Sequence, residues 1–172
     1  MKKWYKLFLI SLLSSLVYSC SGENFHLRGH GNNRALNISE TFYIKGVNRS
    51  SRFASALYAA IKRSGSAVSN NKSQASIQLD ISNINEGKVA AGYSRARKVR
   101  EYDIFLKLDY RFKRLHHEVG LVTQGKINVM RTQLYDSDFA LGKAEEEETI
   151  RQELRNSAAE TMLTKLYYVK QN

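Results

Sequence analysis

The sequence contains no proline and only one cysteine, Cys20. A single cysteine excludes an intramolecular disulfide framework and any metal site built from several cysteines. Without proline, the turns must depend on Gly, Asn, Asp and Ser. Long apolar runs are also scarce. The one extended run, Leu7–Ser19, is shorter than the about 20 residues that a membrane-spanning helix needs.

Acidic residues are in the minority, and this imbalance points to an anionic partner. The chain has 27 Lys and Arg against 16 Asp and Glu, which gives a formal net charge of +11. Such a charge favours nucleic acid, an anionic lipid surface or a phosphorylated ligand. The cellular compartment decides between these partners, and the first 20 residues bear on the compartment.

The N-terminus has the pattern of an exported lipoprotein. The basic segment Met1–Lys6 precedes the uncharged run Leu7–Ser19, an order typical of a bacterial secretory signal. The following "LVYSC" resembles a lipobox, whose cysteine is acylated after cleavage, so residues 1–19 are predicted to be a lipoprotein signal peptide. The resemblance implies a diacylglycerol and an N-acyl chain on Cys20, which together anchor a protein stably. Ser21 implies sorting to the outer membrane, and a plain secretory signal is the alternative.

Cleavage before Cys20 changes the charge balance little. It removes three lysines and no acid, which leaves 24 basic and 16 acidic residues and a net charge of +8. A basic periplasmic protein on a lipid tether rarely meets nucleic acid, whereas lipopolysaccharide is the abundant anion there. Residues 20–34 are predicted to be a polar, lipidated linker. Residues 35–172 are predicted to form one domain, long enough for one core.

Hydrophobic periodicity predicts the element order β-α-β-β-β-α for this domain. We expect an α+β fold in which two helices pack on one face of a four-stranded, mainly antiparallel sheet. The expected strands cover 35–46, 75–84, 101–115 and 119–136, and the expected helices cover 51–64 and 143–170.

Local signals support the two helices. Ser50 or Ser51 can cap the first helix, and Gly65 fits the position just after its end. The apolar stripes that we expect in the core comprise Phe53, Leu57, Ala60 and Ile61 in the first helix, and Ile150, Leu154, Ala158, Ala159, Met162, Leu163 and Leu166 in the second. The acids Glu145–Glu148 are expected near the positive N-terminal end of the second helix.

The strand at 101–115 has the clearest alternation in the chain. Tyr102, Tyr110 and Phe112 are expected in the core, whereas Phe105 points to the opposite face. We hypothesise that Phe105 contacts a partner barrel wall or lipid acyl chains. In the following strand, Gly125 suggests a bulge.

Three segments in order resemble the lipopolysaccharide-assembly lipoprotein family LptE. They are "FHLR" at Phe25–Arg28 shortly after Cys20, "REYDIFLKLDYRF" at Arg100–Phe112, and "DFALGKAEEEETIRQELRNSAAETMLTKL" at Asp138–Leu166. The resemblance implies a non-enzymatic outer-membrane subunit of the lipopolysaccharide translocon. Members of that family plug an LptD-type β-barrel, assist its assembly and bind lipopolysaccharide.

The resemblance also implies ligand contacts from a loop before the long strand and from the approach to the last helix. These positions match Arg95 and Lys143, with Arg97, Lys98 and Arg100 as substitutes that stay open. All but Lys143 lie in a predicted basic loop, Lys88–Arg100, whose Arg side chains can bind phosphates through two donors at once. The alternative is a solvated basic hairpin.

An enzyme is not expected. The sequence contains no phosphate-binding glycine loop between a strand and a helix, and no nucleophile elbow. The alternative functions are a periplasmic-facing lipoprotein adaptor for cell-wall or other protein partners, a secreted hydrolase, and a cytosolic nucleic-acid binder that retains residues 1–19. No metal and no cofactor are expected besides the acyl chains on Cys20.

Overall fold

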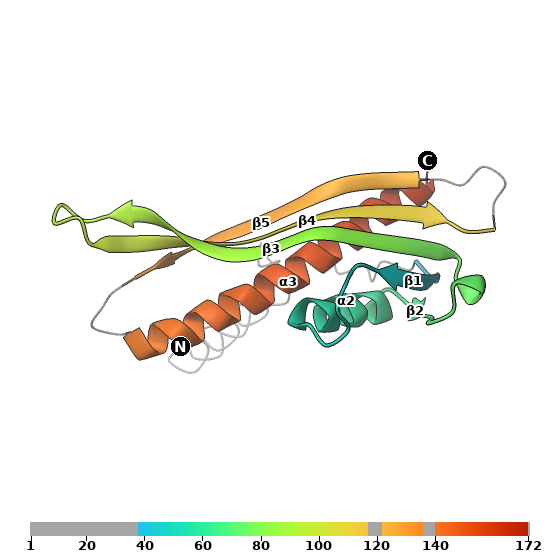
Figure 1. Ribbon diagram of the computed structural model, residues 1–172, viewed down its shortest axis with the longest axis horizontal. Helices are drawn as coiled ribbons and strands as arrows, with labels where there is room; N and C mark the ends of the chain where they lie inside the picture. The colour runs from blue at the N-terminus through green and yellow to red at the C-terminus, as the bar shows by residue number, and fades with distance from the viewer. Residues whose placement is uncertain (1–37, 117–121, 136–139, 172) are drawn as a thin grey trace, which may run out of the picture. The chain divides into compact units, whose positions relative to one another are not determined.

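The computed structural model describes residues 38–116, 122–135 and 140–171 (Figure 1). The predicted signal peptide, the linker and Cys20 lie outside these residues, as does the "FHLR" segment. The elements are β1 (Thr41–Lys45), α2 (Arg52–Arg63), β2 (Ala67–Val68), a short 3₁₀ helix η2 (Lys72–Gln74), β3 (Ile77–Tyr93), β4 (Val99–Arg114), β5 (Val122–Leu134) and α3 (Ala140–Gln171).

The described residues form one α+β domain in which both helices cover the same face of the sheet (Figure 1). The sheet has the strand order β2-β1-β3-β4-β5. The prediction of a four-stranded, mainly antiparallel sheet is wrong, because the sheet has five strands of mixed orientation. β1 runs parallel to both β2 and β3, whereas β3, β4 and β5 form an antiparallel meander. β2 escaped prediction because two residues cannot display an alternating pattern.

Helix α2 forms as its sequence predicts. The Ser51 hydroxyl accepts a hydrogen bond from the Ala54 N–H at 3.1 Å, which caps the first turn. The predicted apolar stripe is buried. Gly65 follows the C-cap Ser64 and has φ +72°, a conformation that favours glycine.

The strands β3 and β4 are longer than expected, and their pairing has register shifts near Ser82 and between Ala90 and Tyr93. The predicted basic loop Lys88–Arg100 is wrong in extent, because β3 continues to Tyr93 and β4 begins at Val99. A register shift lies between Ser82 and Asn85, where Asn83 has φ +53°. Such a bulge adds one residue to one strand and exchanges its two faces beyond that point.

The exchange of faces brings charged side chains under the helices. Before the bulge, Leu79 of β3 lies opposite Phe112 of β4, and both are buried. Beyond the bulge, Glu86 lies opposite Leu106 and Lys88 opposite Ile104. The helix-facing side of β3 therefore changes from apolar to ionic along its length.

Two glycines lie under aromatic rings, one on each face of the sheet. The bulge predicted at Gly125 is absent, because the pairing of β4 with β5 has no register shift. A Cβ atom at Gly125 would lie 2.6 Å from the Tyr110 Oη, so the glycine makes room for this core tyrosine. On the opposite face, a Cβ at Gly87 would lie 2.7 Å from Phe105 Cζ. The prediction that Phe105 points away from the core is confirmed.

The remaining predicted core positions of β4 differ in burial. Tyr110 and Phe112 are buried, as expected, whereas Tyr102 is only half-buried. Tyr102 lies near the end of β4 that approaches the hairpin turn, where α3 contributes charged rather than apolar side chains.

Helix α3 has an apolar C-terminal half and a polar N-terminal part. Its predicted stripe from Ile150 to Leu166 is buried, and burial of each Ile, Leu or Met side chain of the stripe contributes about 1.5–3 kcal/mol. Residues 142–149 contain no buried side chain. The helix begins at Ala140, so Glu145–Glu148 lie beyond its first turn, which contains no acid. Neither of the described helices is long and apolar enough to cross a membrane.

Candidate functional site

The turn between β3 and β4 is tightly hydrogen-bonded. The Ser94 N–H donates to the Lys98 carbonyl at 2.8 Å, and the Arg97 N–H donates to the Ser94 carbonyl at 2.9 Å. The Ser94 hydroxyl accepts a further bond from the Lys98 N–H at 3.2 Å. Arg97 has φ +59°, a left-handed conformation that is uncommon for a residue other than glycine. The basic side chains of this turn therefore project from a fixed backbone.

The cations of this turn are exposed to solvent. We name the hairpin cations Arg95, Arg97, Lys98 and Arg100. All four are exposed, and none forms an ion pair within the part of the chain that the structure describes. β5 ends opposite Glu101, so the turn between β3 and β4 extends beyond the end of β5. Arg and Lys in this arrangement can bind several oxygens of a phosphate-bearing ligand.

Lys143 lies in the first turn of α3, at the same end of the sheet as the hairpin turn. Its carbonyl accepts a hydrogen bond from the Gln133 Nε2 at 2.9 Å, and Gln133 pairs with Tyr102 of β4. Lys98, the residue just before β4, is four residues from Tyr102, which corresponds to about 13 Å of extended chain. Unlike the hairpin cations, Lys143 is engaged, because its Nζ lies 2.6 Å from the Glu146 Oε2.

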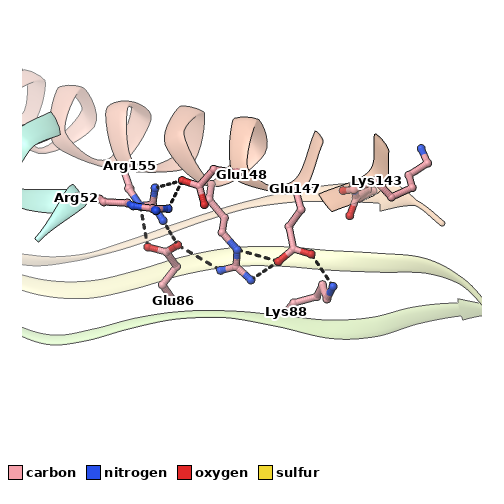
Figure 2. Close-up of polar contacts among 9 residues, drawn as sticks. Arg52, Glu86, Lys88, Lys143, Glu147, Glu148 and Arg155 are labelled. Carbon is pink, nitrogen blue, oxygen red and sulfur yellow. Dashed lines mark hydrogen bonds and ion pairs between the residues drawn. The ribbon is translucent and has the colours of Figure 1, made fainter. Parts of the chain in front are cut away.

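An ion-pair network holds the N-terminal part of α3 to β3 and α2 (Figure 2). Glu86 of β3 accepts two hydrogen bonds from the guanidinium of Arg155, at 2.6 and 3.0 Å, and one from Arg151 at 3.2 Å. Arg155 is 5% exposed. We name this group of residues the clasp: Arg52, Glu86, Lys88, Glu147, Glu148, Arg151 and Arg155.

The clasp has alternating charges that stabilise one another. Burial alone would lower the pKa of Arg155, but the hydrogen bonds that it donates to Glu86 and Glu148 raise it. Burial alone would raise the pKa of Glu147, but hydrogen bonds from Lys88 and Arg151 lower it. The charged forms of Arg155 and Glu147 are therefore favoured in the folded protein.

The structure divides the residues of the predicted basic loop into two groups. Arg95, Arg97 and Lys98 lie on the turn, and Arg100 lies at the start of β4. Lys88 belongs to the clasp instead, since its Nζ lies 2.6 Å from Glu147 and 4.6 Å from the centre of the Tyr102 ring. It is thereby separated from the hairpin cations.

Sequence reasoning missed the acceptor and the two arginines at the centre of the clasp. A signal for the arginines was present: Arg151 and Arg155 are four residues apart and adjoin Ile150 and Leu154 of the apolar stripe. Charged side chains at the border of a buried stripe require a partner from another element. Glu86 gave no comparable signal, because its facing direction depends on the bulge.

Other functional chemistry finds little support in the described part of the chain. It contains no group of three or more His, Cys, Asp or Glu that could hold a metal ion. Two features distinguish the described part of the domain: a hairpin whose cations have no ion pair among the described residues, and a long helix held to the sheet by a partly buried ion network. Together they define a small α+β domain with a cationic hairpin at one end of its sheet.

The chain belongs to the lipopolysaccharide-assembly family LptE, whose model matches residues 39–166. The fold resembles that of three solved lipoproteins. Rare lipoprotein B from Shewanella oneidensis is 15% identical with a TM-score of 0.64, and the match covers 76% of this chain and 96% of that one. The uncharacterized lipoprotein B from Nitrosomonas europaea is 20% identical with a TM-score of 0.67, and the match covers 87% of this chain and 94% of that one. A minor lipoprotein from Acinetobacter baumannii is 10% identical with a TM-score of 0.61, and the match covers 77% of this chain and 94% of that one. No curated protein matches the sequence.

Proposed function

We propose that the chain is a non-enzymatic, lipid-anchored subunit of the outer-membrane lipopolysaccharide translocon. In this proposal Cys20 carries the acyl chains, residues 1–19 are removed, and residues 20–34 tether the domain to the periplasmic side of the outer membrane. The domain plugs an LptD-type β-barrel, assists its assembly and binds lipopolysaccharide during its insertion. Family membership and the three similar folds support a role in lipopolysaccharide assembly.

The observation that carries the binding proposal is the concentration of four exposed cations on and beside one turn. Other basic residues of the described chain also lack an ion pair, among them Arg49 and Arg111, but the hairpin cations gather within six residues of sequence and have no acidic partner among the described residues. Like charges that gather without neutralising acids repel one another, and a polyanion relieves that repulsion. The phosphates of lipid A are such a ligand, with Arg95 and Lys143 as the leading contacts and Arg97, Lys98 and Arg100 beside them.

Binding is tested by removing two of these charges. The double substitution Arg95→Gln and Lys143→Gln should weaken binding of purified lipopolysaccharide roughly tenfold or more at low salt, because each lost contact is a charge-assisted hydrogen bond. The matched control is Lys62→Gln with Lys72→Gln. These exposed lysines lie on α2 and η2, and their removal lowers the net charge equally. Equal affinities of the two variants would reject the assignment to Arg95 and Lys143.

The barrel and the anchor are tested together. The protein is purified from membranes in detergent, and mass spectrometry is applied to its N-terminus and to co-purifying proteins. We expect a mass at Cys20 that includes acyl chains, and a large β-barrel as companion. A periplasmic adaptor would retain the acyl chains without the barrel.

The outer face of the sheet is our candidate for the barrel contact. Phe105 is half-buried there, and Lys107 lies 4.9 Å from the centre of its ring. Met130, its neighbour on β5, is 60% exposed. Phe105→Ala should reduce co-purification of the barrel. If it lowers the stability of the fold and leaves complex formation intact, the contact lies elsewhere.

A further inference from the structure

We infer that Glu146 is an intramolecular competitor for Lys143, which it holds in a self-inhibited state until a phosphate of the ligand displaces it. This inference rests on the proposed function, because that function assigns lipopolysaccharide binding to Lys143. It adds an ordered sequence to the binding: the hairpin cations engage the ligand first, and Lys143 joins only after it has exchanged partners.

The geometry places Glu146 directly on the amine that the ligand needs. The Glu146 Oε2 lies 2.6 Å from the Lys143 Nζ, with the two residues three apart on α3. The Lys143 side chain is 24% exposed and that of Glu146 is 44% exposed. The buried Gln133 side chain donates a hydrogen bond to the Lys143 carbonyl and so holds the backbone at this position. Because the Glu146 carboxylate neutralises the Lys143 ammonium, a ligand phosphate gains the full attraction of this charge only when it replaces the carboxylate.

The neighbouring acids do not share this role. Glu147 and Glu148 belong to the clasp, where they bind Lys88, Arg151, Arg155 and Arg52. Within the described residues, the Glu145 side chain forms no ion pair. Of the acids at 145–148, Glu146 is thus the one whose ion pair involves a candidate ligand residue.

The strength of the contact suits a displaceable partner. Exposed ion pairs contribute little net stability, because water and salt compete with both charges. A phosphate carries more charge than a carboxylate and presents more acceptor oxygens, so it can replace Glu146 at Lys143. The hairpin cations face no such competition from the described residues, which explains why they are free to act first.

The test compares Glu146→Gln with Glu145→Gln, since both remove one exposed negative charge from the same turn. Binding of purified lipopolysaccharide is measured by titration calorimetry on the folded, full-length protein. Glu146→Gln should bind about two- to fivefold more tightly than Glu145→Gln, which corresponds to an exposed ion pair. Lipopolysaccharide from which the phosphates have been removed should not distinguish the two variants.

A third variant shows whether the effect passes through Lys143. In the Lys143→Met background, Glu146→Gln should no longer increase affinity, because the competitor then has no amine to withhold. Equal affinities of Glu146→Gln and Glu145→Gln would overturn the inference, and so would a gain that persists with Lys143→Met. If the double substitution Arg95→Gln and Lys143→Gln weakens binding and Glu146→Gln changes nothing, only the inference fails. If the unchanged protein does not bind lipopolysaccharide, the proposed function fails and the inference with it.

Discussion

Removing the Glu86 carboxylate should strongly destabilise the domain, because it leaves two arginines without their shared acceptor. The Arg155 side chain is 6% exposed and that of Arg151 is 19% exposed. Breaking a buried ion pair at one partner costs about 3–5 kcal/mol. Glu86 itself is 23% exposed, so water can partly replace it, and we expect Glu86→Ala to cost about 2–3 kcal/mol. The melting temperature should fall by roughly 5–10 °C for a domain of this size.

The assay is urea unfolding followed by circular dichroism, with two comparison variants. Glu153→Ala removes an exposed ion pair between α3 and Arg131 of β5 and should cost less than about 1 kcal/mol. Glu86→Met combined with Arg155→Met removes both charges and should recover most of the loss, since Arg151 keeps Glu147 and Glu148 keeps Arg52. A cost for Glu86→Ala no larger than that for Glu153→Ala would refute the view that the clasp holds α3.

Two further predictions concern packing and pH. Gly125→Ala should cost about 1–3 kcal/mol, because its new methyl group meets the Tyr110 ring. Gly142→Ala, which meets open space in α3, should leave stability unchanged or raise it by up to about 1 kcal/mol; equal urea midpoints for the two variants would contradict this. Because the pKa of Glu147 is lowered on folding, its contribution is complete above the unfolded value of about 4.3 and is lost as the pH falls through the folded value. Acid unfolding of Glu147→Gln should be less steep below about pH 4.3, and a slope equal to that of the unchanged protein would refute it.

The helices could be predicted from the sequence because their signals are local. The Ser51 cap, the apolar stripe of α2 and Gly65 lie within one short segment, and their roles depend on residues three or four positions away. The buried stripe of α3 follows from the same periodicity. Helix α3 begins three residues before its predicted start, because Ala140–Gly142 carry no capping signal.

The sheet could be predicted only in part, because its details depend on contacts between distant residues. The two-residue strand β2 exists through its pairing with β1. The outer half of β3 has no clear alternation after Ser82, so its pairing with β4 was not expected. Asn83, which has a left-handed backbone, lies within the register shift between Ser82 and Asn85, and this shift brings Glu86 and Lys88 to the face that the helices cover.

The candidate site combines predicted and unpredicted parts. The hairpin cations fall on or beside the turn between the two longest strands, close to where the sequence places them, and their ligand role stays a prediction. The ion pairs of Glu86 with Arg151 and Arg155 span 65 and 69 residues of sequence. No local pattern reports such a distance, and the exchange of faces at the bulge conceals it further.

The bulge near Asn83 also constrains how this hairpin can change in length. Between the bulge and Glu86, inserting one residue would turn Glu86 and Lys88 outward and bring Gly87 beneath the helix, whereas inserting two residues would preserve the pattern. Extra residues within 94–98 would leave both strands in phase. Relatives should therefore change in length by even steps between the bulge and Lys88. The segment beyond Ala90, which already contains two register shifts, and the turn can vary without disturbing the clasp.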